Sequence, residues 1–249
     1  MTLPETFQPM SVLHAISAAG CALLVGLVIA AGRRAGRRFA EPAVRRAWVA
    51  FVIAGQLINM AYYLAPSRFD WAWSLPLQLC DIAGWLAAWA LITAHRWPRT
   101  ALYYFGFGLC TQAFITPTLT EGPFHPRYWL FWITHAQIIG SALYDFIVRG
   151  YRPTWRDYGV VSIVFVAYGA LVTPLNITFG WNYGYIGPSV PGKPTLIQSL
   201  GPWPLRMLWV WLIAQGAFAL LTVIGGGFAP IRDGTPHSSG GTIPAGRGE

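Results

Sequence analysis

The sequence predicts an all-α, polytopic membrane protein, a bundle of seven transmembrane helices. Hydrophobic residues make up 55% of the 249 positions and charged residues only 10%, whereas an ordinary soluble domain has roughly 25% charged residues. The apolar residues also come in uninterrupted runs of about twenty, the length that crosses the hydrocarbon core of a bilayer. These two observations exclude a soluble enzyme, a disordered chain and a disulfide scaffold.

Seven apolar runs qualify as membrane helices. In chain order they cover residues 12–31, 47–65, 75–93, 101–117, 129–148, 158–178 and 203–224. Together they predict one transmembrane domain over residues 1–224. Residues 225–249 are rich in Gly, Pro and Ser and have no apolar period, which is typical of a disordered tail.

Positive charge is distributed unevenly among the connecting segments. Thirteen of the seventeen Lys and Arg residues lie after the first, third, fifth and seventh runs, and the segment before the first run has none. Because cytoplasmic segments are enriched in Lys and Arg, we expect the N-terminus outside and the C-terminus, with the tail, in the cytoplasm. The formal charge of +8 therefore indicates topology in the inner (cytoplasmic) membrane rather than nucleic-acid binding.

Polar side chains in five of the runs lie at similar depths, and polar groups among lipid tails are candidates for a functional site. With a rise of about 1.5 Å per residue, most of them fall roughly 8 to 9 Å below the outer ends of their helices, and Asn176 lies nearer the surface. The candidates are Asn59, Cys80, Asp81, Gln112, His135 and Asn176. Near the inner surface, Asp145 lies four residues before Arg149, a spacing that predicts a helix-end ion pair.

A thiol, an imidazole and a carboxylate at one depth are sufficient for acyl transfer. His135 is expected to take the proton of Cys80, and the resulting thiolate is a strong nucleophile. Asp81 is expected to hold the His135 tautomer, and an amide donor such as Asn59, Gln112 or Asn182 to stabilise an oxyanion. The set lacks a close His spacing typical of metal sites, so we expect neither a metal nor another cofactor.

Each candidate also has a purely structural interpretation. Buried cysteines are usually inert packing groups, and the odd number of three, Cys21, Cys80 and Cys110, all inside apolar runs, indicates free thiols. His135 and Asp81 are equally able to form a structural pair, and the amides to join helices by hydrogen bonds. Residues 179–202, an outer connection rich in Gly and Pro, are expected to fold over the helix ends as a lid.

Several short motifs, in this order along the chain, resemble the YwaF-type bacterial integral membrane proteins, whose eukaryotic relative is transmembrane protein 164. They are the run Leu75-Pro76-Leu77-Gln78-Leu79-Cys80-Asp81, the pair Thr116-Pro117, His135, the run Gly150-Tyr151-Arg152-Pro153-Thr154, the set Asn176, Asn182, Tyr183 and Tyr185, and the run Gly201-Pro202-Trp203-Pro204. The resemblance covers roughly residues 47–224. It implies lipid acyl transfer, because the eukaryotic branch passes a fatty acyl group through a Cys to an ether-type lysophospholipid, with Cys80 as acyl acceptor and His135 as its partner.

The leading hypothesis is therefore a lipid acyltransferase on the outer-leaflet side that uses a Cys80 thioester, with Asn59, Gln112, Asn176, Asn182 and Tyr183 as substrate-binding or oxyanion residues and membrane lipids as partners. Two other classes stay open. In a lipid or small-solute transporter, Asp81 and His135 form a proton-coupled site, so pH-dependent flux survives the loss of Cys80. In a non-catalytic scaffold, Cys80 is unreactive and Asp81→Asn harms folding more than any activity.

Overall fold

The structure is a computed structural model that describes residues 5–188 and 196–226. Helices form the framework of this part of the chain, joined by one isolated β-bridge between Thr6 and Glu121. The elements are α1 (Val12–Gly36), α2 (Glu41–Leu64), α3 (Leu79–Thr93), α4 (Arg96–Phe105), the π-helical turn η1 (Gly106–Cys110), α5 (Gln112–Ile115), α6 (Pro126–Ile147), α7 (Trp155–Phe179), the 3₁₀ turns η2 (Tyr183–Tyr185) and η3 (Leu196–Leu200), and α8 (Leu205–Gly226).

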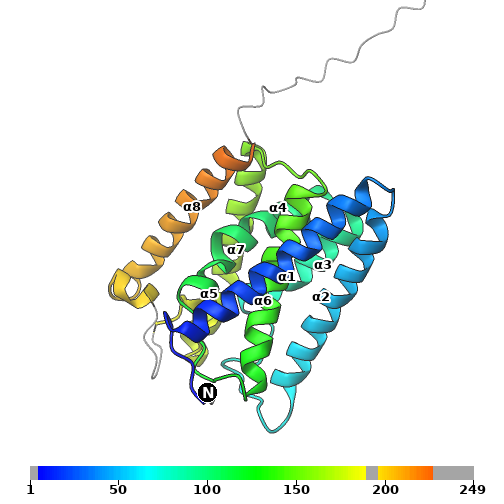
Figure 1. Ribbon diagram of the computed structural model, residues 1–249. Coiled ribbons are helices and arrows are strands. Elements are labelled where there is room, and N and C mark those ends of the chain that lie inside the picture. Colours follow the sequence, from blue (N-terminus) through cyan, green and yellow to red (C-terminus); the bar gives the residue numbers. More distant parts are fainter. Residues whose placement is uncertain (1–4, 189–195, 227–249) are drawn as a thin grey trace, which may run out of the picture.

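Each of the seven predicted runs corresponds to helix, with α4, η1 and α5 following one another along a single path. The helices lie side by side in one bundle and cross it in alternating directions (Figure 1). α6 packs against α1, α2, α3 and α4, and α7 and α8 pack against each other and against the α4 and η1 path. α6 is thus the central helix, and α1, α7 and α8 lie on the outside.

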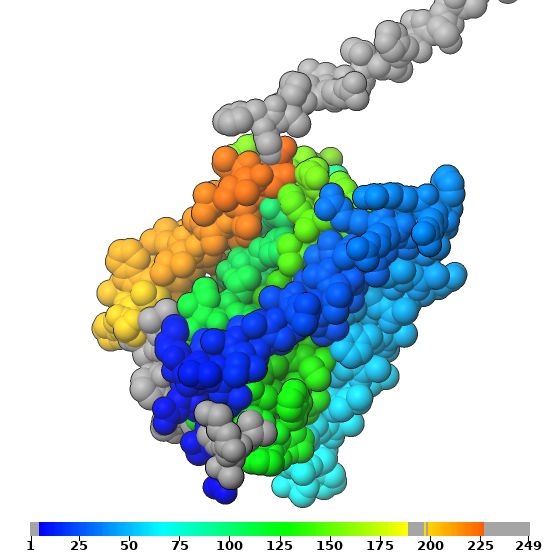
Figure 2. Space-filling view, in the orientation of Figure 1, coloured from blue at the N-terminus to red at the C-terminus, as the bar shows by residue number. Residues whose placement is uncertain are grey.

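Apolar side chains cover the outside of this bundle. Ile16 on α1, Ile163 on α7 and Ile224 on α8 are 63%, 71% and 69% exposed, and Figure 2 shows α1 and α8 lying along the surface. Within the described residues, four helices, α1, α2, α7 and α8, are long and apolar enough to cross a bilayer. An exterior of this kind is stable only in lipid, so the structure confirms an all-helical membrane protein.

The central helix α6 hides its polar side chains from lipid. Gln137 and Ser141 are fully buried, where Gln137 Nε2 donates to the Phe51 carbonyl at 2.7 Å and Trp48 Nε1 donates to Ser141 Oγ at 2.9 Å. Buried polar groups need such partners because no water replaces them. This polar core explains why α6 is less apolar than the helices at the lipid surface.

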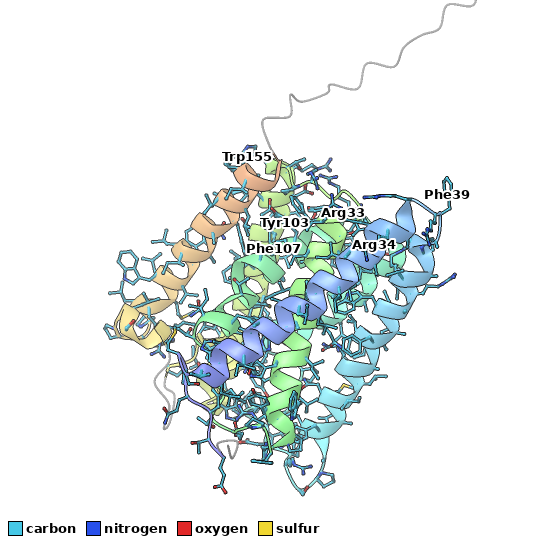
Figure 3. The ribbon with its side chains drawn as sticks, viewed as in Figure 1. Arg33, Arg34, Phe39, Tyr103, Phe107 and Trp155 are labelled. Atoms are coloured by element: carbon cyan, nitrogen blue, oxygen red, sulfur yellow. The ribbon has the colours of Figure 1, made fainter. Side chains whose placement is uncertain are left out.

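Ion pairs tie the helices together at the end of the bundle expected to face the cytoplasm. Asp145 lies 3.2 Å from Arg149, which confirms the predicted pair, and also 2.7 Å from Arg99. Arg33, Arg34, Phe39 and Trp155 lie toward this end as well (Figure 3). The buried Asp145 carboxylate therefore joins two other segments instead of lining a path through the bundle.

Several helix boundaries differ from the predicted ones. α2 begins at Glu41 and so includes charged residues before its apolar run, while α8 continues to Gly226. α3 begins at Leu79 rather than at 75, because Leu75 precedes Pro76 and a residue in that position avoids helical geometry. The rest of the predicted disordered tail lies outside the described residues.

Candidate active site

The first turn of α3 carries Cys80 and Asp81. The irregular chain before it is fixed from α7 and from the following loop: Tyr168 Oη donates to the Leu77 carbonyl at 2.8 Å, and the Leu75 N–H donates to Tyr183 Oη at 3.1 Å. Cys80 therefore lies at a helix start beneath a connecting segment, and not one and a half turns inside a longer helix as the predicted boundary implied.

Cys80 lies between two side chains that interact with its sulfur. The thiol of Cys110, at the end of η1, donates to Cys80 Sγ across 3.7 Å, and the imidazole of His135 from α6 lies close enough to the same thiol to interact with it electrostatically. Three segments, α3, η1 and α6, thus bring one thiol into contact with a base and a second thiol. The predicted proximity of Cys80 and His135 is present in the structure.

The ring of His135 is oriented by its own helix. Its Nδ1 lies 2.7 Å from the Phe131 carbonyl, and because a carbonyl only accepts, Nδ1 carries the proton. Nε2 is then the basic nitrogen of the neutral ring. The sequence assigned this orienting role to Asp81, and the structure gives it to the Phe131 carbonyl, which lies one helical turn earlier and needs no side chain.

Asp81 has a different neighbour. Asn59 Nδ2 on α2 donates to Asp81 Oδ1 at 3.4 Å, and the carboxyl lies within electrostatic range of both Cys80 and His135. It also lies in the first turn of α3, where the helix dipole favours a carboxylate. Asp81 and Asn59 therefore lie beside the Cys80 thiol, on one side of the candidate site.

Three of the predicted amide and phenol residues hold the loop that follows α7. The fully buried Asn176 binds the N–H and the carbonyl of Tyr183 at 2.9 Å each, and Tyr183 Oη donates to the Trp71 carbonyl at 2.6 Å. Asn182 Oδ1 accepts the Gly187 N–H at 2.8 Å. These residues fix the described part of the connection after α7, and Asn176 and Tyr183 already use their polar atoms on backbone groups.

Gln112 does not join the other candidates. It is exposed, and its Nε2 donates at 2.5 Å to Oγ1 of Thr116, the residue that directly follows α5. The five-residue π-helical turn η1 directly before it changes the helical repeat, so a residue placed by uniform spacing ends up on a different face. Its predicted oxyanion role therefore has no geometric support.

Three neighbours of Cys80 escaped the sequence reasoning. Cys110 was interpreted as an inert packing group, although it lies two residues from Gln112 and so at nearly the same depth. Tyr168 and Tyr185 both lie within electrostatic range of Cys80, and burial raises the pKa of Tyr185 in the loop. Tyr residues are common in membrane proteins, so only the three-dimensional structure shows that Tyr168 and Tyr185 lie near Cys80.

Comparison with known families supports the resemblance seen in the motifs. The profile of the TMEM164 family matches residues 6–222. The chain belongs to the TMEM164 family. The match extends from the N-terminal segment that pairs with Glu121 to the last turns of α8, and so includes α1, which the motifs left out. Searches of curated proteins and of solved structures find no match to this TMEM164-family chain.

Proposed function

We propose that this TMEM164-family protein is a membrane-embedded lipid acyltransferase that carries a fatty acyl group on Cys80 as a thioester. The observation that supports the proposal is the position of the Cys80 thiol between the His135 imidazole and the Cys110 thiol. An imidazole with a free Nε2 removes a thiol proton, and a second thiol that donates to the sulfur stabilises the charge left there. A purely structural cysteine needs neither group.

In the first half-reaction, His135 Nε2 takes the proton of Cys80, and the sulfur attacks the ester carbonyl carbon of a phospholipid. A C–S bond forms, and the carbonyl oxygen carries negative charge in the tetrahedral intermediate. Asn59 is an amide that binds Asp81, the residue next to Cys80, and its bond to Asp81 is long at 3.4 Å, which leaves it able to donate to that oxygen. The ester C–O bond then breaks, and His135 returns the proton to the departing lysophospholipid oxygen.

The second half-reaction reverses these roles. An acceptor lysophospholipid gives its hydroxyl proton to His135, and its oxygen attacks the thioester carbon. The C–S bond breaks as the new ester forms, and the Cys80 sulfur regains the proton from His135. The cycle conserves atoms and electrons without a cofactor.

The orientation expected from the charge distribution determines which leaflet the proposed reaction would use. The Arg distribution supports an N-terminus outside and a cytoplasmic tail in an inner membrane crossed seven times. Because α3 starts at the same end as α1 (Figure 1), this orientation puts Cys80 on the side of the outer leaflet. A proton-coupled transporter has less support, since Asp145 at the opposite end is ion-paired to Arg99 and Arg149.

The test combines chemical labelling with acyl exchange in vesicles. A thiol-directed probe with a lipid tail, followed by peptide mass spectrometry, should label Cys80 in preference to Cys21 and Cys110. Cys80→Ala should abolish acyl exchange between phospholipids while the protein still folds and inserts, and Cys21→Ala, a thiol on α1, should leave exchange unchanged. Undiminished exchange in Cys80→Ala contradicts the proposal.

A further inference from the structure

The loop formed by residues 182–187 is held by three polar side chains from three segments. The Gly184 N–H donates to Gln78 Oε1 at 3.0 Å, and the Gly187 N–H donates to Asn182 Oδ1 at 2.8 Å. Arg206, in the first turn of α8, donates through Nη2 to the Gly187 carbonyl. These bonds use only part of each side chain, and the remaining atoms are all donors.

Each of the three side chains keeps one buried donor without an acceptor in the described structure: Gln78 Nε2, Asn182 Nδ2 and Arg206 Nε. Asn182 and Arg206 are only 6% and 7% exposed. Among the described residues, no carboxylate lies within ion-pair distance of Arg206. A buried guanidinium and amide donors of this kind are stable when an anion satisfies them.

The position of these donors indicates which anion they would meet. Arg206 lies at the N-terminus of α8, where helix geometry favours negative charge. The same end of the bundle carries the exposed aromatic residues Trp71 and Phe179, 61% and 58% exposed, and aromatic belts lie at the level of lipid headgroups. Phosphate is the negatively charged group that all phospholipid headgroups carry at that level.

The same loop is connected to the start of α3. Tyr183 binds the backbone of Leu75, and Gln78 lies two residues before Cys80. A headgroup held at Gln78, Asn182 and Arg206 is therefore next to the turn that carries the thiol. A phosphate diester, which has only acceptor oxygens, matches a set of atoms that are all donors.

We propose that Arg206, Asn182 and Gln78 form a phosphate-binding site for the headgroup of a phospholipid substrate. This inference rests on the proposed acyl transfer for its purpose, and it predicts binding that does not depend on catalysis. The site would hold the phosphate at the interface while the ester and the acyl chains extend toward Cys80 and the bilayer.

Binding is measured with the full chain in detergent, carrying Cys80→Ala so that no acyl group is transferred. The probes are a short-chain lysophospholipid with a phosphate, a monoacylglycerol of the same chain length without one, and inorganic phosphate. We expect the lysophospholipid to bind and the monoacylglycerol to bind at least tenfold more weakly, while inorganic phosphate alone stays far weaker because it lacks the acyl chain.

Three variants test the residues. Arg206→Gln should weaken lysophospholipid binding by about 10-fold to 100-fold, the loss typical of a charge-assisted contact. Asn182→Asp keeps the oxygen that binds Gly187 and replaces the free donor with an acceptor, so it should weaken binding at least as much. Arg68→Gln, which removes an exposed Arg at the same end of the bundle, is the matched control and should bind like the unsubstituted protein.

Three results overturn the inference: equal binding by Arg206→Gln, equal binding of the lysolipid and the monoacylglycerol, or full competition by inorganic phosphate at lysolipid concentrations, which would make this a free-phosphate site. If Arg206→Gln does not fold, Asn182→Asp and the comparison of the three probes still test the inference. Failure of the proposed acyl transfer gives a different result. In that case the thiol probe does not label Cys80 in the unsubstituted chain, but phosphate-dependent binding of the lysophospholipid persists.

Discussion

The sulfur atoms of Cys80 and Cys110 lie 3.7 Å apart, with Cys110 as the donor. They come from α3 and from the π-helical turn η1, and it is this turn that carries Cys110 toward α3. π-helical turns cost stability relative to a regular helix and are frequent at functional sites. The contact therefore gives Cys110 a positioning role in the proposed chemistry rather than a role in packing alone.

Cys110→Ala should slow thioester formation at Cys80. A hydrogen bond to a charged group contributes about 1.5 to 3 kcal/mol, so we expect probe labelling to slow by roughly 10-fold to 100-fold. Cys110→Ser keeps a donor and should slow labelling less. Cys21→Ala removes a thiol that instead donates to the Trp132 carbonyl, and it should not change the rate. Equal labelling rates in all three variants would show that Cys110 only fills space.

The two ring nitrogens of His135 are expected to have separate roles, which the variant His135→Asn tests. Asn at this position retains a donor near the place of Nδ1 and is able to bind the Phe131 carbonyl, but it offers no base toward Cys80. His135→Asn is therefore expected to keep its unfolding temperature close to that of the unsubstituted protein and to lose Cys80 labelling. Folding is followed by thermal unfolding in detergent and labelling by mass spectrometry. Retained labelling would assign the proton transfer to another group.

The sequence predicted which of these residues lie close together better than it predicted how they are oriented. Depth along the helices brought Cys80, Asp81, His135 and Asn59 together correctly, because every helix crosses the same slab and rise per residue is nearly constant. Gln112 was placed at a suitable depth and yet lies on an exposed face. Depth is a one-dimensional quantity, and rotation about the helix axis depends on η1 and on packing that no local pattern encodes.

Backbone carbonyl groups also orient side chains near the site, and the sequence does not reveal which carbonyl groups do so. The Phe131 carbonyl orients His135, and the carbonyl of Gly187 receives Arg206. Every residue has such a carbonyl, so its identity carries no signal. The seven helices, in contrast, were predictable because lipid demands long apolar runs, and only their ends moved, as at Pro76 before α3.

The pair of Glu121 and Arg127 should make the stability of the outer end depend on pH. Burial alone raises the pKa of Glu121, but hydrogen bonds and charge from Arg127, at 2.6 Å, outweigh it and lower the pKa from 4.5 to about 2. The folded value lies below the unfolded one, so the pair stabilises the fold above 4.5 and loses this effect as the pH falls toward 2.

Glu121→Gln lacks this interaction at every pH. We therefore expect the unsubstituted protein to unfold at a higher temperature than the variant near neutrality, and the difference to shrink as the pH falls through that window. Glu5→Gln changes an exposed carboxylate on the segment opposite and is the control. A difference that stays constant on acidification would mean that the charge of Glu121 does not stabilise the fold.

Gly84 should tolerate no side chain, because α2 and α3 meet there. A Cβ at Gly84 would lie 2.4 Å from the amide of Gln56, which is only 3% exposed, so the buried Gln56 side chain would have to shift. Overpacking of this kind typically costs about 1 to 3 kcal/mol. Gly84→Ala should lower the unfolding temperature, and because Gly84 lies about one turn from Cys80, it should also slow labelling of the thiol.

The matched control for Gly84→Ala is Gly20→Ala. Gly20 lies on the exposed face of α1, where a Cβ would have no neighbour within 4 Å, and Ala is the better helix former. This variant should unfold at the same or a higher temperature and label Cys80 at the normal rate. Equal effects of both alanines on the unfolding temperature and on Cys80 labelling would contradict this prediction. The close approach of α2 and α3 would then not position the first turn of α3, and the loop held by Tyr183 would be left to do so.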